Sequence, residues 1–401
     1  MSGMNNAAGR GVYGIITFSV FMGSILLLLQ FNARAALAIA LATVATATVA
    51  PEYLQVNHTT GDPPPSGAVE HVQTVVLSGG RDAVGESQPD DCPTIMIGTA
   101  TPGGDHTNGW AEIPIVAGFD LRRLVVDQDA NATIMYYIEN TKDFSQVKRV
   151  VITIAGLWRN GWKYANNMRN SLLCAAGRET IDADMNQILI AAPQWLNEED
   201  VAVGATVPND IYFHNNIYQR GAAAVGPGEV HISSYEAMDQ LVNIFWNKDI
   251  FPALESIVIA SHLHNLTQLY AMLRPTQPQD PQITFGIMNP GSYAWPLPSR
   301  PAQSEECSET YDDWPYGIGP GDPDPFSAYV RDEALANRIA IEERYFNKKI
   351  FYGFGLEGHG LGDSHCEAEW QGSTHLERVQ NFQRMLDGLP GGMPAGHYRL
   401  H

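Results

Sequence analysis

The residues most able to do chemistry lie in two short segments, each of which follows an apolar run that is rich in β-branched or aromatic residues. Residues 261–265 (Ser-His-Leu-His-Asn) follow the run 256–260, and Asp363 and His365 lie beyond the run 349–355. Serine, histidine and aspartate are the residue types of a serine hydrolase. Histidine and aspartate also bind metals, so a metal site between the two segments is a second hypothesis. The simpler interpretation, which we favour, is that these histidines are solvated or hydrogen-bonded and hold no metal.

The elements that must position these residues form an alternating pattern from Val147 onward. Strands are predicted at residues 147–156, 187–195, 256–261, 283–290 and 349–355, and helices at 158–173, 233–246 and 266–273. Such alternation predicts a mostly parallel sheet flanked by helices. Any ligand site should then lie at the carboxyl ends of the strands. The stretch 295–326, dense in Pro, Gly, Ser and Asp, is expected to form a long loop over these ends.

Composition excludes some classes of function. The chain has 44 acidic and 24 basic residues and a formal net charge of −20. Such a surface repels phosphate backbones, so nucleic-acid binding is not expected. Hydrophobic residues make up 44% of the chain, enough for a core. The four cysteines form no Cys-x-x-Cys pair, and we predict neither a metal nor a cofactor.

The N-terminal part differs from the rest of the chain. Residues 1–50 hold no acidic residue, and the apolar run 14–31 is long enough to cross a bilayer as a helix. A signal peptide, a signal anchor and an organelle presequence all fit, and we favour the first two. We expect a secretory-pathway protein, membrane-anchored or extracellular, with an organelle membrane as the alternative. Residues 51–75 indicate a linker, and the globular domain is expected over residues 76–401.

Three Asn-x-Thr sequons support the secretory interpretation. They begin at Asn57, Asn131 and Asn265. Glycosylation of Asn265 would be awkward, because this residue lies beside the segment that could do chemistry. We therefore predict glycosylation at Asn57 and Asn131.

Seven segments, taken in order, resemble a family of secreted or membrane-anchored α/β-hydrolases that is common in fungi and other microbes. The first resembles the family motif His-Gly-x-x-Arg-Asn-x-x-x-Tyr, which Ala155-Gly156, Arg159-Asn160 and Tyr164 match apart from the histidine. The others are residues 190–195, 231–239, 251–262, 287–295, 307–318 and 365–382. The resemblance spans about residues 110–401 and implies the α/β-hydrolase fold: a mostly parallel central sheet flanked by helices, preceded here by a hydrophobic segment.

The resemblance also fixes the position of the nucleophile. Hydrolases of this fold hold a serine in a Gly-x-Ser-x-Gly turn, and the match over 251–262 places Leu263 at the serine position. Leucine has no nucleophilic atom. A shifted register would offer Ser261, but without the small residue that should follow it. The backbone N–H groups near Leu157 and His264 would form the oxyanion hole.

The other triad positions are equally incomplete. The acid of the family would follow residue 355, where Gly358 stands in register and Asp363 is a nearby substitute. The histidine base would lie near the C-terminus, where His397 is a candidate. The resemblance further implies a disulfide between Cys307 and Cys366.

We therefore expect a catalytically degenerate α/β-hydrolase-like protein that acts as a binding or structural module, for example in a membrane-associated assembly. Its partner would be a protein or a small-molecule ligand, and the N-terminal segment would contact the membrane. The alternative is a secreted or membrane-anchored serine hydrolase that cleaves ester or amide bonds through Ser261.

Overall fold

The computed structural model describes residues 104–114, 116, 118–177, 181, 183–262, 265–319, 326–356 and 358–399. The predicted signal or anchor segment, the linker and Asn57 lie outside the described residues. Within the described part of the chain, no helix combines the length and the apolar character needed to cross a bilayer.

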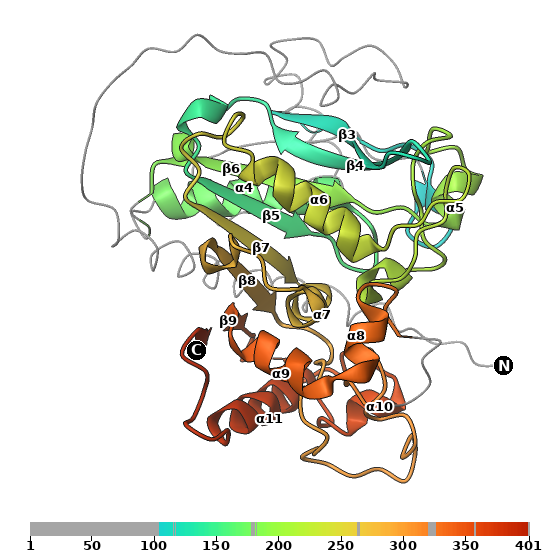
Figure 1. Ribbon diagram of the computed structural model, residues 1–401, viewed down its shortest axis with the longest axis vertical. Coiled ribbons are helices and arrows are strands. Elements are labelled where there is room, and N and C mark those ends of the chain that lie inside the picture. Colours follow the sequence, from blue (N-terminus) through green and yellow to red (C-terminus); the bar gives the residue numbers. More distant parts are fainter. Residues whose placement is uncertain are drawn as a thin grey trace, which may run out of the picture.

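A central sheet of eight strands organises the molecule (Figure 1). In their order across the sheet, the strands are β3 (Phe119–Asp127), β4 (Ala132–Glu139), β6 (Ile188–Gln194), β5 (Arg149–Ile154), β7 (Ser256–His262), β8 (Ile283–Met288), β9 (Lys349–Gly353) and β10 (His397–Arg399). β4 runs antiparallel to both of its neighbours, and the pairs from β6 to β10 are parallel. The predicted mostly parallel sheet is confirmed, and its order agrees with the α/β-hydrolase fold that the resemblance implies.

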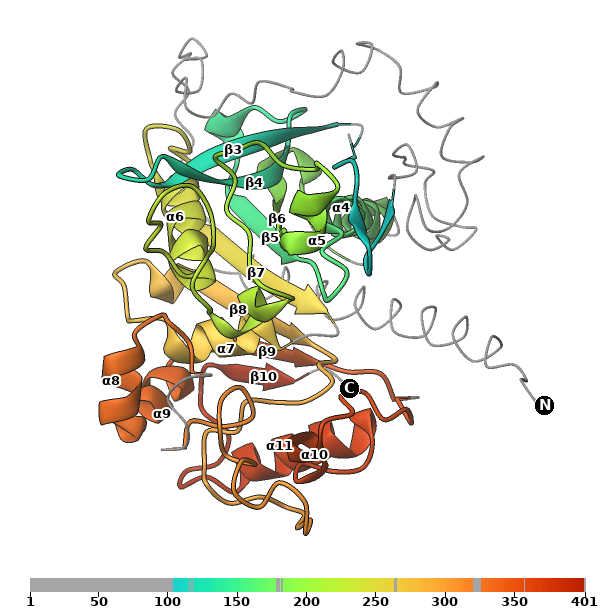
Figure 2. The same cartoon turned by 90° about the vertical axis from the view of Figure 1, so that its right-hand side faces the viewer.

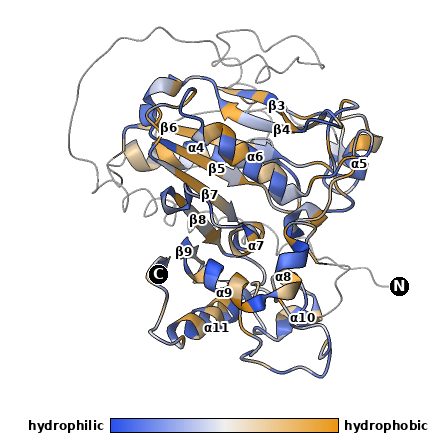
Figure 3. Ribbon diagram, in the orientation of Figure 1, coloured by the Kyte–Doolittle hydropathy of each residue, from blue (hydrophilic) through white to orange (hydrophobic). Residues whose placement is uncertain are grey.

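Continuous apolar runs build the centre of this sheet. Five of the six residues of β5 and all seven of β7 are buried, because helices cover both faces of a parallel sheet. Figure 3 shows β5 and β7 as predominantly hydrophobic ribbons. The five predicted strands correspond to β5 to β9, whereas β3, β4 and β10 lie outside the predicted runs.

The helices are α4 (Gly161–Gly177), α5 (Glu198–Ala202), α6 (Ser234–Trp246), α7 (Leu266–Leu273), α8 (Arg331–Ala336), α9 (Arg338–Phe346), α10 (Cys366–Glu369) and α11 (His375–Asp387). Shorter elements are the hairpin β1 (Gly104–Asp105) and β2 (Gly109–Trp110) and the 3₁₀ turns η3 (Phe144–Gln146), η4 (Met185–Gln187), η5 (Ile217–Arg220) and η6 (Asp280–Gln282). The predicted helices over 158–173, 233–246 and 266–273 correspond to α4, α6 and α7. Ser233 caps α6 through a capping box with Glu236.

The two faces of the sheet carry separate apolar cores. Apolar side chains of α4 pack on one face, while those of α6, α7 and α11 pack on the other. Figure 2 shows α4 and α6 on opposite sides of the sheet. This layered arrangement leaves the carboxyl edge of the strands to loops.

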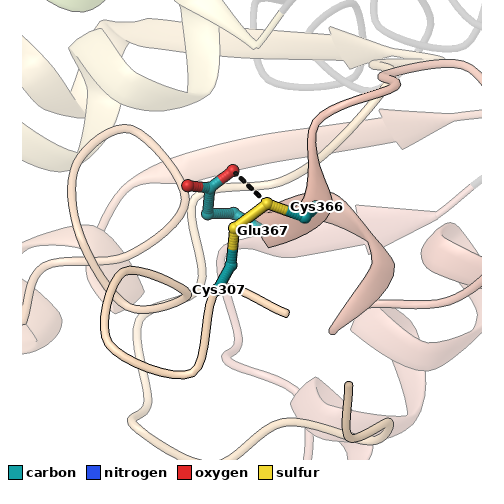
Figure 4. Close-up of side chains that lie close together, drawn as sticks. All are labelled: Cys307, Cys366 and Glu367. Atoms are coloured by element: carbon teal, nitrogen blue, oxygen red, sulfur yellow. Dashed lines mark hydrogen bonds between the residues drawn. A yellow bond between two sulfur atoms is a disulfide. The ribbon is translucent and has the colours of Figure 1, made fainter. Parts of the chain in front are cut away.

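A disulfide joins two of these loops, as the resemblance implies. Cys307 lies in the long irregular segment between β8 and α8, and Cys366 begins α10; their Cα atoms are 5.9 Å apart (Figure 4). Tyr311 stacks on Trp370 beside this link, with ring centroids 4.3 Å apart. The predicted pairing is confirmed.

Replacing both cysteines by serine should destabilise the protein. The link closes a loop of 59 residues, and such a link stabilises a protein by about 2–4 kcal/mol, since it limits the unfolded chain. Urea denaturation of the oxidised wild type and of the Cys307→Ser/Cys366→Ser variant would measure the difference. Reductant should lower the midpoint of the wild type more than that of the variant. Equal midpoints of the two oxidised proteins would contradict this prediction.

Candidate functional site

The loops that follow β5, β7, β8 and β9 share one edge of the sheet, because these strands run parallel. The described residues that follow these strands are 155–160, 265, 289–292, 354–356 and 358–365. Ligands of open parallel sheets bind at this edge. Any functional site that the sheet positions is therefore expected there.

A buried ion pair anchors the loop after β5. The Arg159 side chain is buried, and its Nε and Nη2 lie 2.7 and 3.1 Å from the two carboxylate oxygens of Asp200. Its other N–H groups donate to Asn216 Oδ1 at 2.9 Å and to the His106 carbonyl at 3.1 Å. A guanidinium that meets a carboxylate through two N–H groups is fixed in orientation as well as position. The loop after β5 is thereby tied to α5.

The start of the same loop is also held. Tyr218 of η5 donates its hydroxyl hydrogen to the Gly156 carbonyl at 2.8 Å. The next two residues, Leu157 and Trp158, are the exposed part of the loop. Leu157, which was expected to supply an oxyanion N–H, thus lies on a loop with a fixed backbone. His264, the second expected donor, lies outside the described residues.

Ser261 lies within β7 rather than on the turn beyond it. It pairs with Ile154 of β5 and with Ile287 of β8, and its side chain is buried. Its Oγ accepts the Thr267 backbone N–H of α7 at 3.4 Å. A nucleophile must reach its substrate, and this side chain faces the packed interior. Leu263, the residue at the expected nucleophile position, lies outside the described residues.

Asp363 is the centre of a polar cluster at the carboxyl edge. Ser292 donates its hydroxyl to Asp363 Oδ2 at 2.7 Å, while the Nδ1 and the backbone N–H of His365 lie 2.6 and 3.1 Å from Oδ1. Burial alone would raise the pKa of Asp363, but the hydrogen bonds from His365 and Ser292 outweigh it and lower the pKa. The carboxylate is therefore ionised, and hydrogen bonds from the protein stabilise its charge. Ser292 hydrogen-bonds the acid directly, so no histidine stands between them as a base.

Arg378 of α11 ties this cluster to the neighbouring loop. Its Nη1 donates to the carbonyls of Asp363 and Gly291 at 2.9 and 2.6 Å. His375, one turn earlier, packs against Gly362, which adopts a left-handed φ of 68° and leaves no space for a Cβ atom. Burial lowers the pKa of His375 to about 4. The cluster therefore holds the exits of β8 and β9 against α11.

His397 lies apart from both Ser261 and Asp363. It pairs with Ile350 near the amino end of β9, whereas Asp363 follows the carboxyl end of that strand. Its Nδ1 lies 3.1 Å from the Tyr352 hydroxyl, and its Nε2 lies 3.2 Å from the Tyr345 carbonyl. Burial lowers the pKa of His397 to about 4, so the ring is neutral at pH 7. These contacts suit a buried hydrogen-bonding residue.

Among the described residues, the three candidates for a triad thus belong to separate hydrogen-bond networks. Ser261 contacts α7, Asp363 contacts Ser292 and His365, and His397 contacts two tyrosines. The sequence did not single out Ser292. Its only signal was its place after a predicted strand, in the segment that resembles the family's Asn-Pro-Ser-Ser-Tyr.

The hypothesis of a histidine and aspartate metal site rests on two loops whose described residues do not form such a cluster. Over the described residues, Cys307, Cys366 and Glu367 are the group of three potential ligands that lie within 4.8 Å of one another. Figure 4 shows the two sulfur atoms bonded to each other beside the carboxylate. Disulfide sulfur is not a thiolate, which is the form that binds metals.

Asn131, one of the two predicted glycosylation sites, lies in the turn between β3 and β4. Its side chain is exposed, and its backbone adopts a left-handed φ of 49°. The position leaves room for a glycan, and glycosylation stays a prediction.

Comparisons with known proteins find similarity only at the level of structure. No protein-family model matches this sequence, and no curated protein matches it. LpqC, a poly(3-hydroxybutyrate) depolymerase from Bordetella parapertussis, is 18% identical, with a TM-score of 0.41 over 71% of this chain and 83% of that chain. Poly(aspartic acid) hydrolase-1 from Sphingomonas sp. KT-1 is 13% identical, with a TM-score of 0.40 over 70% and 90%. Esterase Est22 is 13% identical, with a TM-score of 0.35 over 71% and 73%. At these values the similarities carry no argument about the function of this chain.

Asp200→Asn should destabilise the protein strongly. The amide would leave the buried Arg159 charge without its carboxylate, and loss of one partner of a buried ion pair costs about 3–5 kcal/mol. Urea denaturation measures this change. The matched control is Asp387→Asn, since Asp387 pairs with Arg399 at the exposed surface, and its midpoint should hardly move. Similar midpoints for the two variants would refute the anchoring role of Arg159.

The neutral His397 should make stability depend on pH. Its pKa is about 4 in the folded state against an ordinary value of 6.5. The unfolded chain therefore gains a proton that the folded chain does not, and the free energy of unfolding falls as the pH drops from 6.5 towards 4. His397→Gln should flatten this fall by up to about 1.4 kcal/mol per pH unit. The slope of the free energy of unfolding between pH 6.5 and 4 is measured for both proteins, and an unchanged slope in His397→Gln would contradict the prediction.

Proposed function

We propose that this chain is a catalytically degenerate α/β-hydrolase-like protein that acts as a binding module through the carboxyl edge of its sheet. The observation that carries the proposal is that Ser261, Asp363 and His397 lie in three different hydrogen-bond networks of the described residues. Acyl transfer by a serine requires a base within hydrogen-bond reach of the hydroxyl. The assignment of Leu263 to the nucleophile position by the sequence supports the same conclusion.

Exposed apolar side chains at this edge support a binding role. Leu157 and Trp158, in the loop after β5, are 48% and 49% exposed, and Leu356 and Leu361, in the loop after β9, are 60% and 66% exposed. Large apolar side chains that gather at one edge are typical of interaction sites. We call these four residues the apolar rim.

The rim is carried on loops that are held from beneath. The Arg159 ion pair fixes the first loop, and the Arg378 hydrogen bonds to Asp363 and Gly291 fix the second loop against the exit of β8. Loops that are ordered before binding lose less conformational entropy when a partner binds. This arrangement favours recognition of a protein partner or a small ligand by a preformed surface.

The cellular setting is part of the proposal. The apolar run 14–31 and the sequons at Asn57 and Asn131 support a secretory-pathway protein that is membrane-anchored or extracellular. The acidic composition and the hydrophobic N-terminal segment support the proposal that the chain binds a partner in a membrane-associated assembly. We propose no nucleic-acid partner and no cofactor.

An activity-based probe tests the absence of serine chemistry. A fluorophosphonate modifies a serine only where a base and an oxyanion hole activate it. The wild-type protein should stay unlabelled under conditions that label an active esterase to completion, and Ser261→Ala should behave identically. Labelling of the wild type that disappears in Ser261→Ala would overturn the proposal and establish the serine hydrolase alternative. Ser292→Ala is the matched control, because Ser292 hydrogen-bonds Asp363 in the edge cluster.

A further inference from the structure

A cavity of about 610 Å³ lies beside η5, between residues 214–225 and residues 326–331. The two segments are joined by hydrogen bonds. The Ala328 backbone N–H and the Ser327 hydroxyl both donate to the Gly221 carbonyl at 2.9 Å. The cavity therefore has walls of fixed spacing. Its volume is in the range of pockets that hold small organic ligands.

Most of the cavity wall is apolar. Ala222, Ala223 and Ala224 form one stretch of it, and Ile217, Val225 and Phe326 contribute larger side chains. Three consecutive alanines leave space that larger residues would fill. The wall suits an aliphatic chain.

The charged side chains of the wall are cationic. Arg220 and Arg331 line the cavity, and its described lining holds no carboxylate. Arg331 donates to the Phe326 carbonyl at 2.9 Å. His214, at the exposed end of the wall, adds a positive charge when it is protonated, and it lies 3.8 Å from Glu198.

Arg220 differs from the other arginines that the fold partly encloses. Arg159, Arg123 and Arg300 each pair with an aspartate. The half-buried guanidinium of Arg220 has no ion pair and no hydrogen bond with any described residue, although acidic residues outnumber basic ones in the chain, 44 to 24. A guanidinium that is partly removed from water and has no carboxylate partner among the described residues is suited to take an anion from a ligand.

The backbone at Arg220 is held in place, although its guanidinium has no ion pair with a described residue. Trp314 Nε1 donates to the Arg220 carbonyl at 2.8 Å, and Gly221, which follows, adopts a left-handed φ of 76° and has no space for a Cβ atom. The positive charge of Arg220 also lowers the pKa of Tyr316, against the larger effect of burial. The backbone that carries this arginine is thus held beside the cavity that the residue lines.

We propose that this cavity binds an anionic amphiphile, namely a carboxylate with a short aliphatic chain. The carboxylate would accept two N–H groups of Arg220, and the chain would lie against the alanines and Phe326. This inference goes beyond the proposed function, because the apolar rim and the cavity are built by different residues and the cavity needs no catalytic serine.

Calorimetric titration of the full-length protein with octanoate tests the proposal. Octanoate should bind with a dissociation constant below about 1 mM, and Arg220→Gln should weaken binding about tenfold or more, because a charge-assisted pair is lost. Octanamide, which has the same chain without the charge, should bind wild type about tenfold more weakly than octanoate does. Arg384→Gln is the matched control, since Arg384 is exposed on α11, and it should bind octanoate like the wild type.

A second variant guards against loss of fold. Ala222→Leu, at a half-buried alanine of the wall, would narrow the cavity without touching a charge, and it should abolish binding while the melting temperature stays near that of the wild type. Absence of octanoate binding by the wild type, equal binding by Arg220→Gln, or equal binding of octanamide would each overturn the proposal. None of these results depends on fluorophosphonate labelling, so failure of this inference and failure of the proposed function are separate outcomes.

Discussion

The buried pair between Arg159 and Asp200 is the interaction on which the rest of the functional edge depends. Removing a guanidinium and a carboxylate from water is costly unless each finds its full set of partners, and here the arginine makes four hydrogen bonds. These bonds join the exit of β5 to α5, to the loop before η5 and to the segment of β1. One charged residue thereby links four segments of the chain. An enzyme of this fold would use such a loop to stabilise an oxyanion, and the same rigidity serves binding equally well.

Much of the fold follows from local signals. Residues 150–152 of β5 and 257–260 of β7 are continuously apolar, and Ser233 with Glu236 marks the start of α6. β10 was not predicted, because a strand of three residues is too short to show a periodic pattern of hydrophobic residues. β3 and β4 escape because the alternating pattern of strand and helix begins after them.

The candidate site was predictable only in part, since its contacts join distant residues. Arg159 belongs to a motif of the resembling family, but nothing marks Asp200, 41 residues later, as its partner. The bond from Ser292 to Asp363 spans 71 residues. Alternation along β7 does explain Ser261, which lies two residues beyond Ile259 and shares its buried face. The disulfide came from the resemblance and not from the spacing of cysteines.

The two edges of the sheet have a consequence for how copies of this molecule meet. β3 is an edge strand of nine residues and has one neighbour. This strand contains the charged residues Asp120, Arg122 and Arg123. Its pairing with β4 is irregular between Val125 and Asp127. Charges and irregularities on an edge strand hinder the addition of a foreign strand. At the other edge, β10 offers three residues, too few for a stable added strand. Over the described residues, both sheet margins therefore offer little backbone to which a strand of another copy could add.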